Sequence, residues 1–168
     1  MKQQPISRRT AIGMTALAVM GTLSAASNAR AQPAAPDSPK AKSVVSLVDK
    51  AAALVDSKDK SAFADFRQNG SEWFHADTYV FILDLNGVEL FNAPRPDLEG
   101  KNLIGLKDKT GKAFHQAFVD TVKAHGAGWV DYLWPKPGTD TPMQKWSYVK
   151  AVTVDGTPAL LGVGMYLD

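Results

Sequence analysis

Aromatic residues and lysines gather in the last third of this sequence, in runs that have the residue alternation of β-strands. Three of the four tryptophans and three of the four tyrosines lie beyond Gly126. Aromatic walls with a few polar groups are typical of small-molecule pockets. A carboxylate that enters such a pocket loses its hydration, and only a cation with several hydrogen-bond donors offsets that loss. These strands therefore favour a binding site for a small anion over a catalytic centre.

Seven residues supply the donors, aromatic surface and charge that such a site needs: Tyr79, Asn92, Arg95, Tyr132, Trp134, Lys145 and Tyr148. Strand alternation places Tyr132 and Trp134 on one face, where they either wall a pocket or pack under a helix. It places Lys145 and Tyr148 on opposite faces, so both reach one ligand only if the strand bends or bulges near residues 142–144. We still favour this pair as ligand contacts.

Three of these candidates have a plain structural alternative. Lys145 is either a ligand contact or a solvated lysine on an edge strand. Arg95 stands between two prolines in a loop, where surface exposure is the expectation unless it binds ligand. Asn92 is equally suited to forming a turn.

The ingredients of a catalytic or metal site are sparse. His75, His115 and His125 form no metal-binding pair at helical spacing, and we expect each to be a surface or capping residue. The segments that begin at Asp84 and Asp108 superficially resemble calcium loops but lack the ligand series and the terminal glutamate. The sequence has no phosphate loop, nucleophile elbow or haem attachment motif. We therefore predict no cofactor, no metal and no enzymatic activity.

The N-terminus has the three-part pattern of a twin-arginine export signal over residues 1–31. Arg8 and Arg9 precede a mildly apolar run, and a small-residue site predicts cleavage after Ala31. Without the four cations of this segment, the formal net charge falls from +2 to about −2. We therefore expect a periplasmic protein that neither binds nucleic acid nor spans a membrane after cleavage. The lack of cysteines fits a domain that folds before export, without disulfides.

Helices are expected next in the chain. Residues 32–38 form a Pro/Ala spacer, and Ser38 then predicts the first turn of a helix. The helical spacing of apolar residues continues to about Val55. Ser57 is expected to cap a shorter second helix that ends near Gly70.

The remaining sequence has mostly strand periodicity, which together with the helices predicts an α+β fold. Asn86-Gly87 between two apolar runs predicts a hairpin with a type I′ turn. Asp108 or Thr110 is expected to cap a further helix that ends near Gly126. Five strands are expected, at residues 79–85, 88–91, 128–134, 144–154 and 159–167.

Six stretches, in this order, resemble the single Cache domain family: residues 79–87, 99–103, 108–112, 128–137, 145–150 and 162–168. The resemblance covers most of a domain at residues 39–168. It implies a PAS-like α+β fold, with a five-stranded antiparallel sheet, a long N-terminal helix and flanking helices. Cache domains are extracytoplasmic sensor modules of chemoreceptors and histidine kinases, and many single-Cache members bind small carboxylates.

Two departures from the family limit what the resemblance implies. The chain has Asn92-Ala93-Pro94 where members often carry a His-Pro pair, so the identity of the ligand does not follow. It ends at Asp168, where receptors continue into a membrane helix and an output domain. We therefore expect a free periplasmic protein that presents a small organic acid or similar metabolite to a membrane receptor, histidine kinase or transporter. Closure of the loop at residues 92–102 over the aromatic sheet would favour the conformer that the partner recognises.

Two other functions remain open from the sequence. A periplasmic enzyme or enzyme accessory would use Asp131, Lys145 or a histidine in the same cavity, and it needs a titratable pair within hydrogen-bond reach. A ligand-free domain would instead dimerise through its long first helix. In that case an apolar helix face is left exposed, and the cavity is filled by the domain's own side chains.

Overall fold

The computed structural model describes residues 36–167, which belong to one compact unit. The predicted export signal, with Arg8, Arg9 and the cleavage site after Ala31, lies outside the described residues, as does most of the predicted spacer. No helix within residues 36–167 combines the length and the apolar character that crossing a membrane requires.

The described residues form the helices and strands of an α+β fold, as the sequence predicts. The helices are α1 (Pro39–Lys58), the 3₁₀ helix η1 (Asp59–Ser61), α2 (Ala62–Phe66), the 3₁₀ helix η2 (Pro96–Leu98) and α3 (Phe114–His125). The strands are β1 (Phe74–His75), β2 (Thr78–Asp84), β3 (Glu89–Asn92), β4 (Ala127–Pro135), β5 (Pro142–Val154) and β6 (Thr157–Tyr166).

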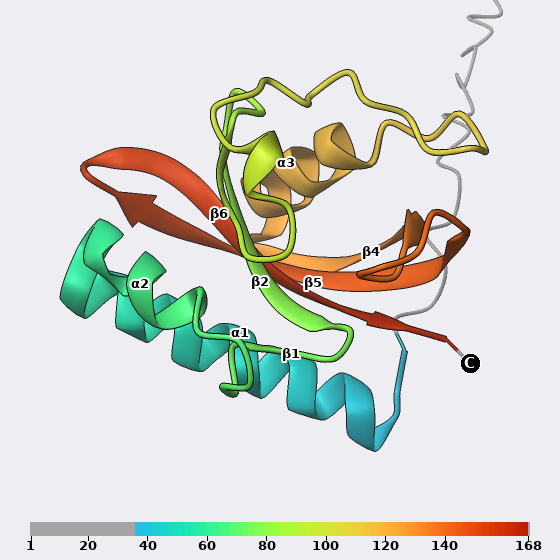
Figure 1. Cartoon of the computed structure of the whole chain (residues 1–168). Helices are drawn as coiled ribbons and strands as arrows, with labels where there is room; N and C mark the ends of the chain where they lie inside the picture. The colour runs from blue at the N-terminus through green and yellow to red at the C-terminus, as the bar shows by residue number, and fades with distance from the viewer. Residues whose placement is uncertain (1–35, 168) are drawn as a thin grey trace, which may run out of the picture. The chain divides into compact units, whose positions relative to one another are not determined.

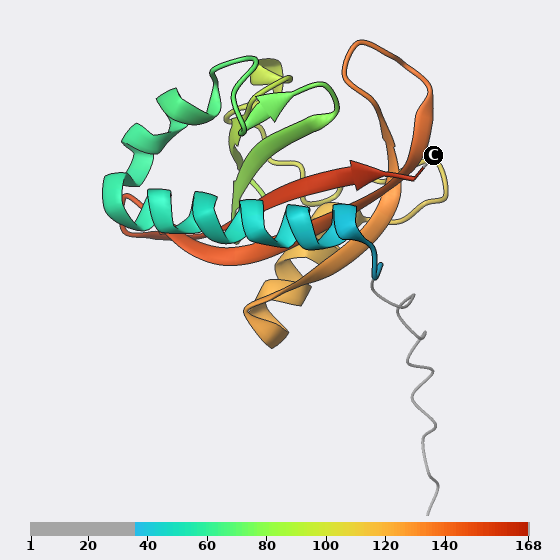
Figure 2. The same ribbon diagram turned by 90° about the horizontal axis from the view of Figure 1, so that it is seen from below.

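The strands form one antiparallel sheet in the order β1-β2-β6-β5-β4, with β3 also paired to β2. Five of these strands match the predicted ones, and the sixth is the two-residue β1. Helix α1 packs on one face of the sheet, against β5 and β6, whereas α3 covers β4 and β5 on the other face (Figures 1 and 2). The sheet therefore separates an α1 side from an α3 side.

Helix α1 begins where the sequence predicts, but it ends later. The Ser38 side chain accepts a hydrogen bond from the Ala41 N–H at 3.1 Å, which satisfies one free donor of the first turn. The predicted helix start at Ser57 is wrong, because Ser57 lies within α1 and donates its hydroxyl to the Leu54 carbonyl. The chain leaves α1 at Asp59, whose φ of 52° is incompatible with a right-handed helix.

The hairpin between β2 and β3 is present, but its turn is not of the predicted type I′. Gly87 has a positive φ of 89° and Asn86 does not, whereas type I′ needs a positive φ at both central positions. The Asp84 carboxylate accepts the N–H groups of Asn86 and Val88 at 2.9 and 2.8 Å. This side chain holds a three-residue loop with glycine in its last position, which is the next most common hairpin connection.

A bulge in β3 decides which of its side chains share a face. The register with β2 shifts between Ile82 and Leu83, so that Leu90 pairs with no residue of β2. Glu89 and Asn92 are three positions apart, which regular alternation would place on opposite faces. Because of the bulge they lie on the same face, and their side chains are hydrogen-bonded to each other.

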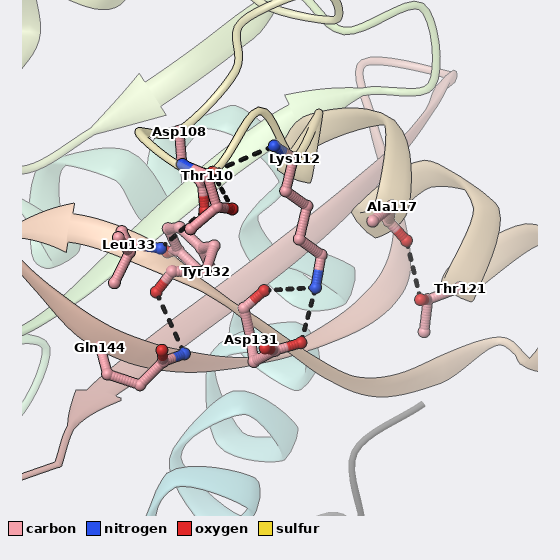
Figure 3. A network of polar contacts seen from close by, with 9 residues as sticks. All are labelled: Asp108, Thr110, Lys112, Ala117, Thr121, Asp131, Tyr132, Leu133 and Gln144. Carbon is pink, nitrogen blue, oxygen red and sulfur yellow. Dashed lines mark hydrogen bonds and ion pairs between the residues drawn. The ribbon is translucent and has the colours of Figure 1, made fainter. Parts of the chain in front are cut away.

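One aspartate attaches the loop before α3 to β4 (Figure 3). Asp108 accepts hydrogen bonds from the N–H groups of Thr110 and Lys112 through Oδ1, and from the Leu133 N–H through Oδ2. Lys112 donates to the carbonyl oxygen and to Oδ1 of Asp131, both at 2.6 Å. The predicted helix cap at Asp108 or Thr110 is therefore wrong, because both residues lie in the loop and Asp108 already accepts bonds from the loop and from β4.

Two glycines of β6 leave room for side chains on the α3 side. A Cβ atom on Gly164 would lie 2.0 Å from Cε of Lys145 and 2.7 Å from Oγ of Ser147. A Cβ atom on Gly162 would lie 2.4 Å from the ring of Phe81. The stem of Lys145 thus crosses β6 directly above Gly164.

Gly164→Ala is expected to destabilise the fold, because the new methyl group has no room beside the Lys145 stem. Overpacking of this kind costs about 1–3 kcal/mol of unfolding free energy. Gly105→Ala is the matched control, since a Cβ atom at Gly105 meets no atom within 4 Å and its φ is not positive. Urea denaturation of both variants measures the difference, and equal midpoints would contradict this packing.

Candidate ligand-binding site

Two small cavities on the α3 side of the sheet share Tyr79 and Trp134 in their walls. The outer cavity, of about 90 Å³, lies beside the β4–β5 connection and is lined by Tyr79, Pro94, Arg95, Trp134 and residues 135–139. The inner cavity, of about 20 Å³, is lined by Tyr79, Phe81, Glu89, Asn92, Leu98, Phe114, His115, Phe118, Tyr132 and Trp134. The inner cavity has room for one water-sized group.

Lys145 lies behind these cavities with none of its surface exposed. Its Nζ donates a hydrogen bond to Tyr79 Oη at 2.6 Å, and it lies 5.1 Å from the centroid of the Tyr166 ring. The alternative of a solvated edge-strand lysine is wrong, because β5 lies between β6 and β4. Burial lowers the pKa of Lys145 to about 7, since the ammonium has lost its hydration.

Three tyrosine rings surround this ammonium. Tyr132 Oη lies 2.9 Å from Ser147 Oγ, and Tyr166 donates its hydroxyl to the Pro135 carbonyl at 2.7 Å. Burial is the largest cause that raises the pKa of Tyr79, Tyr132 and Tyr166 above its ordinary value. All three hydroxyls therefore keep their protons at neutral pH and remain hydrogen-bond donors.

Two cationic side chains line the outer cavity, and both have an acidic neighbour. Arg95 makes two hydrogen bonds of 2.7 Å to the Asp97 carboxylate. Lys136 Nζ lies 3.9 Å from an oxygen of Asp77. Both ion pairs are partly exposed, so the two cations are able to exchange these partners for an arriving anion at little cost.

The inner cavity has a polar wall from β3 and α3. Asn92 Nδ2 donates to Glu89 Oε1 at 2.7 Å. The other carboxyl oxygen, Glu89 Oε2, lies 4.0 Å from His115 Nε2, which is too far for a hydrogen bond. Glu89 Oε2 and His115 Nδ1 are buried and have no hydrogen-bond partner within residues 36–167. Burial raises the pKa of Glu89 to about 8 and lowers the pKa of His115 to about 4, so both side chains are neutral at pH 7.

The structure brings five of the seven predicted site residues to the cavity walls: Tyr79, Asn92, Arg95, Tyr132 and Trp134. Lys145 reaches the cavities through the Tyr79 hydroxyl. Tyr148 lies on the other face of the sheet, with its ring centroid 5.3 Å from that of Trp129. The β4–β5 register continues through residues 142–144 without a bulge, so Tyr148 and Lys145 do not meet. Ligand contact by any of the seven stays a prediction.

Three polar residues near the cavities were not expected there from the sequence. His115, predicted at the surface, is buried against the aromatic rings of α3. For Glu89 the sequence does offer an indication, because it is the one charged residue in the apolar strand at residues 88–91. Ser147 had another, because it stands two positions from Lys145 and therefore on the same face of its strand.

The other two histidines, His75 and His125, are exposed as predicted. Within the part of the chain that the structure describes, no three His, Cys, Asp or Glu side chains come close enough to hold a metal ion.

Helix α1 uses its apolar face within its own domain. Its valines Val44, Val48 and Val55 are buried against the sheet. A larger hollow, of about 450 Å³, runs along the helix, where exposed Lys42 and Asp49 are part of its wall. The sheet thus covers the buried face of α1, while Val45 and Trp129 add an apolar part to the wall of this hollow.

The model of the Cache domain family matches residues 49–168, and this chain belongs to that family. The resemblance found in the sequence is thereby confirmed. The chain is 33% identical over 92 residues to the methyl-accepting chemotaxis protein McpP of Pseudomonas putida. It is also 33% identical over 92 residues to the sensor histidine kinase MctS of Rhizobium johnstonii. Each match covers 55% of this chain but only 16% and 19%, respectively, of those relatives.

Solved structures of sensor domains share the fold. A structure described as the periplasmic sensor domain of a chemotaxis protein is 31% identical, with a TM-score of 0.60, over 76% of this chain and 90% of that one. A Cache chemosensory domain described for carboxylic acid recognition is 28% identical, with a TM-score of 0.66, over 77% of this chain and 94% of that one. This chain is therefore similar to sensor domains of chemotaxis and signal-transduction proteins.

Lys145→Met is expected to change how stability depends on pH. Lys145 has a pKa of about 7 in the folded state, against 10.5 as its ordinary value. Between these values the unfolded chain binds more protons than the folded one, so the wild type gains stability relative to the variant as pH rises. We expect this difference to grow by about 1 kcal/mol per pH unit between about pH 7.5 and pH 10. Urea denaturation across this range measures it, and a constant difference would mean that Lys145 keeps its ordinary pKa.

Proposed function

We propose that this chain binds a small carboxylate in the two cavities, as a binding protein and not as an enzyme. The observation that carries the proposal is the buried Lys145 ammonium, held 2.6 Å from the hydroxyl of Tyr79, which lines both cavities. The site therefore offers a cation and a polarised O–H donor beside aromatic walls, which is what a carboxylate needs in a largely apolar cavity.

An anionic ligand would supply charge that this ammonium lacks. Burial lowers the pKa of Lys145 and outweighs the nearby Asp77 carboxylate, which acts to raise it, so that the pKa stays near 7. A ligand carboxylate beside Tyr79 would accept the Tyr79 O–H while the Tyr79 oxygen accepts from Lys145. The negative charge would also favour the protonated lysine. Binding of the anion and protonation of Lys145 thus support each other.

The comparisons support this ligand class and a role in signalling. One similar structure is described for carboxylic acid recognition, and the two curated relatives are a chemotaxis receptor and a sensor histidine kinase. The chain spans only 16% and 19% of the length of those relatives. From the likeness to a receptor and a histidine kinase we propose that the bound state is read by a membrane receptor, a histidine kinase or a transporter.

We place this activity in the periplasm. The support is the twin-arginine pattern at Arg8 and Arg9, together with the similarity to a periplasmic sensor domain. An extracytoplasmic site gives direct access to acids that enter the periplasm from outside the cell.

Movement of the segment at residues 92–102 is the proposed response to ligand. This segment carries Asn92 and Arg95 to the cavity walls. Glu99 Oε1 holds its start by accepting the Asn92 N–H at 3.0 Å. A ligand that draws Arg95 away from Asp97 would shift the segment toward the sheet and favour the conformer that the partner recognises.

An enzymatic role has less support from the same cavities. Glu89 and His115 line the inner cavity, but Glu89 Oε2 and His115 Nε2 are 4.0 Å apart, beyond hydrogen-bond reach. Lys145 and Tyr79 are a titratable pair within reach at 2.6 Å, but Lys145 is fully buried and lines neither cavity, so its amine does not meet a substrate there. Asp131 is held by Lys112 at 2.6 Å and does not line either cavity.

A screen by thermal shift tests the ligand class directly, with acetate, propionate, butyrate and succinate as probes. We expect at least one of them to raise the Tm, because a ligand that binds only the folded state stabilises it. Titration calorimetry then measures the Kd of each acid that does so. If circular dichroism shows folded protein and no acid raises the Tm, the carboxylate proposal is wrong.

Tyr79→Phe is expected to weaken the binding of such an acid about tenfold, which corresponds to one hydrogen bond to a charged group. Tyr148→Phe removes the same atom from the opposite face of the sheet, next to Trp129, and serves as the matched control. Calorimetric Kd values decide the matter. Similar losses in both variants would show that the ligand does not contact the Tyr79 hydroxyl.

A further inference from the structure

Two buried polar atoms of the inner cavity are not used by a simple carboxylate at Tyr79. Glu89 Oε2 and His115 Nδ1 make no hydrogen bond with any residue from 36 to 167. Buried polar groups in folded proteins are nearly always hydrogen-bonded, so each exception needs an explanation. Both side chains line the inner cavity, where a group of the ligand can reach them.

The gap between these side chains has the size of one polar group. Glu89 Oε2 and His115 Nε2 are 4.0 Å apart, so the gap adjoins the unpartnered oxygen of Glu89, whereas the unpartnered Nδ1 of His115 points away from it. An oxygen or nitrogen atom placed about 2.8 Å from each of them fits between the two at normal hydrogen-bond length. The inner cavity, of about 20 Å³, holds one such atom with its hydrogens.

Both side chains are held in place without a ligand. Asn92 Nδ2 binds Glu89 Oε1 at 2.7 Å, which leaves Oε2 toward the gap. The His115 ring lies between two aromatic rings of α3, with centroids 4.2 Å from that of Phe114 and 5.7 Å from that of Phe118. Groups that are fixed beforehand lose little conformational freedom on binding, so they can contribute strongly to affinity.

Charge distinguishes the groups that fit this gap. Glu89 and His115 are both neutral at pH 7, with pKa values of about 8 and about 4. A hydroxyl is uncharged and both donates and accepts, so it matches a neutral carboxyl and a neutral imidazole. An ammonium would bring a second cation into the interior beside Lys145, and a buried charge is far more costly than a buried hydroxyl.

We propose that Glu89 and His115 form an inner subsite for a hydroxyl group, so that the preferred ligand is a short hydroxy acid. This inference rests on the proposed function, in which the carboxylate lies at Tyr79 and the outer cavity. Tyr79 and Trp134 line both cavities, and the proposed pose has the carboxylate in the outer cavity and the hydroxyl in the inner one.

Calorimetry at pH 7 with four matched acids tests the subsite. The probes are propionate, 2-hydroxypropionate, 3-hydroxypropionate and 2-aminopropionate. We expect one of the two hydroxy acids to bind at least about tenfold tighter than propionate, because a site built around a hydroxyl rejects the analogue that lacks it. The amino acid should bind no tighter than propionate.

Variants then assign the preference to these side chains. In Glu89→Leu the ratio of the propionate Kd to the hydroxy-acid Kd should fall to about one, because leucine has no hydrogen-bonding atoms. Glu89→Gln should recover most of the ratio, since an amide can still bind both Asn92 and a hydroxyl. His115→Phe keeps an aromatic ring beside Phe114 and should lower the ratio as well, and it carries the test if Glu89→Leu does not fold. Tyr148→Phe, on the other face of the sheet, should keep the full ratio.

The outcomes separate the two proposals. If none of the four acids binds, the subsite is wrong, and if acetate, butyrate and succinate also fail to bind, the proposed function is wrong with it. If propionate and both hydroxy acids bind equally well, only the subsite is wrong, and a resident water serves Glu89 and His115. Tightest binding of the amino acid would replace the hydroxyl by an ammonium and overturn the inference. A preference that persists in both Glu89→Leu and His115→Phe would overturn it too.

Discussion

Keeping the ammonium group of Lys145 in the interior is the constraint on which the rest of this structure depends. Burying an ammonium costs several kcal/mol of folding free energy, because the ion loses its hydration. Here the compensation comes from the Tyr79 hydroxyl and from the faces of three tyrosine rings. The compensation is incomplete, since the pKa of Lys145 falls to about 7. The domain therefore retains a costly group at the place where a charged ligand would offset the cost.

That constraint explains several choices elsewhere in the sheet. The lysine stem needs a path across β6, and Gly164 supplies it because it has no side chain. The tyrosines must stand on the same face as Lys145, which alternation along the strands provides. The opposite face carries none of this chemistry and buries the valines of α1 instead. The face toward α1 is thus mainly apolar, whereas the face toward α3 combines core aromatic residues with the candidate site.

Much of the fold follows from local patterns in the sequence, but only part of the site does. Alternation alone places Tyr132 and Trp134 together, and a capping serine at residue 38 locates the start of α1. The face of the sheet on which Glu89 lies depends on the bulge at Leu90. This one-residue shift in register cannot be predicted from the alternation of apolar residues. The burial of His115 depends on how α3 is rotated against the sheet, which is a tertiary effect. The interactions of Asp108 include Leu133, twenty-five positions away, so a local reading as a helix cap could not succeed.

Successive side chains of β6 point to opposite faces of the sheet, so this strand contributes both to the α1 side and to the α3 side. Gly164 faces Lys145 and Gly162 faces Phe81, whereas the alternate residues Val163 and Met165 are on the α1 side of the sheet. A displacement of β6 that changes its contact with Lys145 therefore also moves the residues on which α1 packs. Gly164 therefore couples the space around the Lys145 stem to the packing of α1, the longest helix among the described residues.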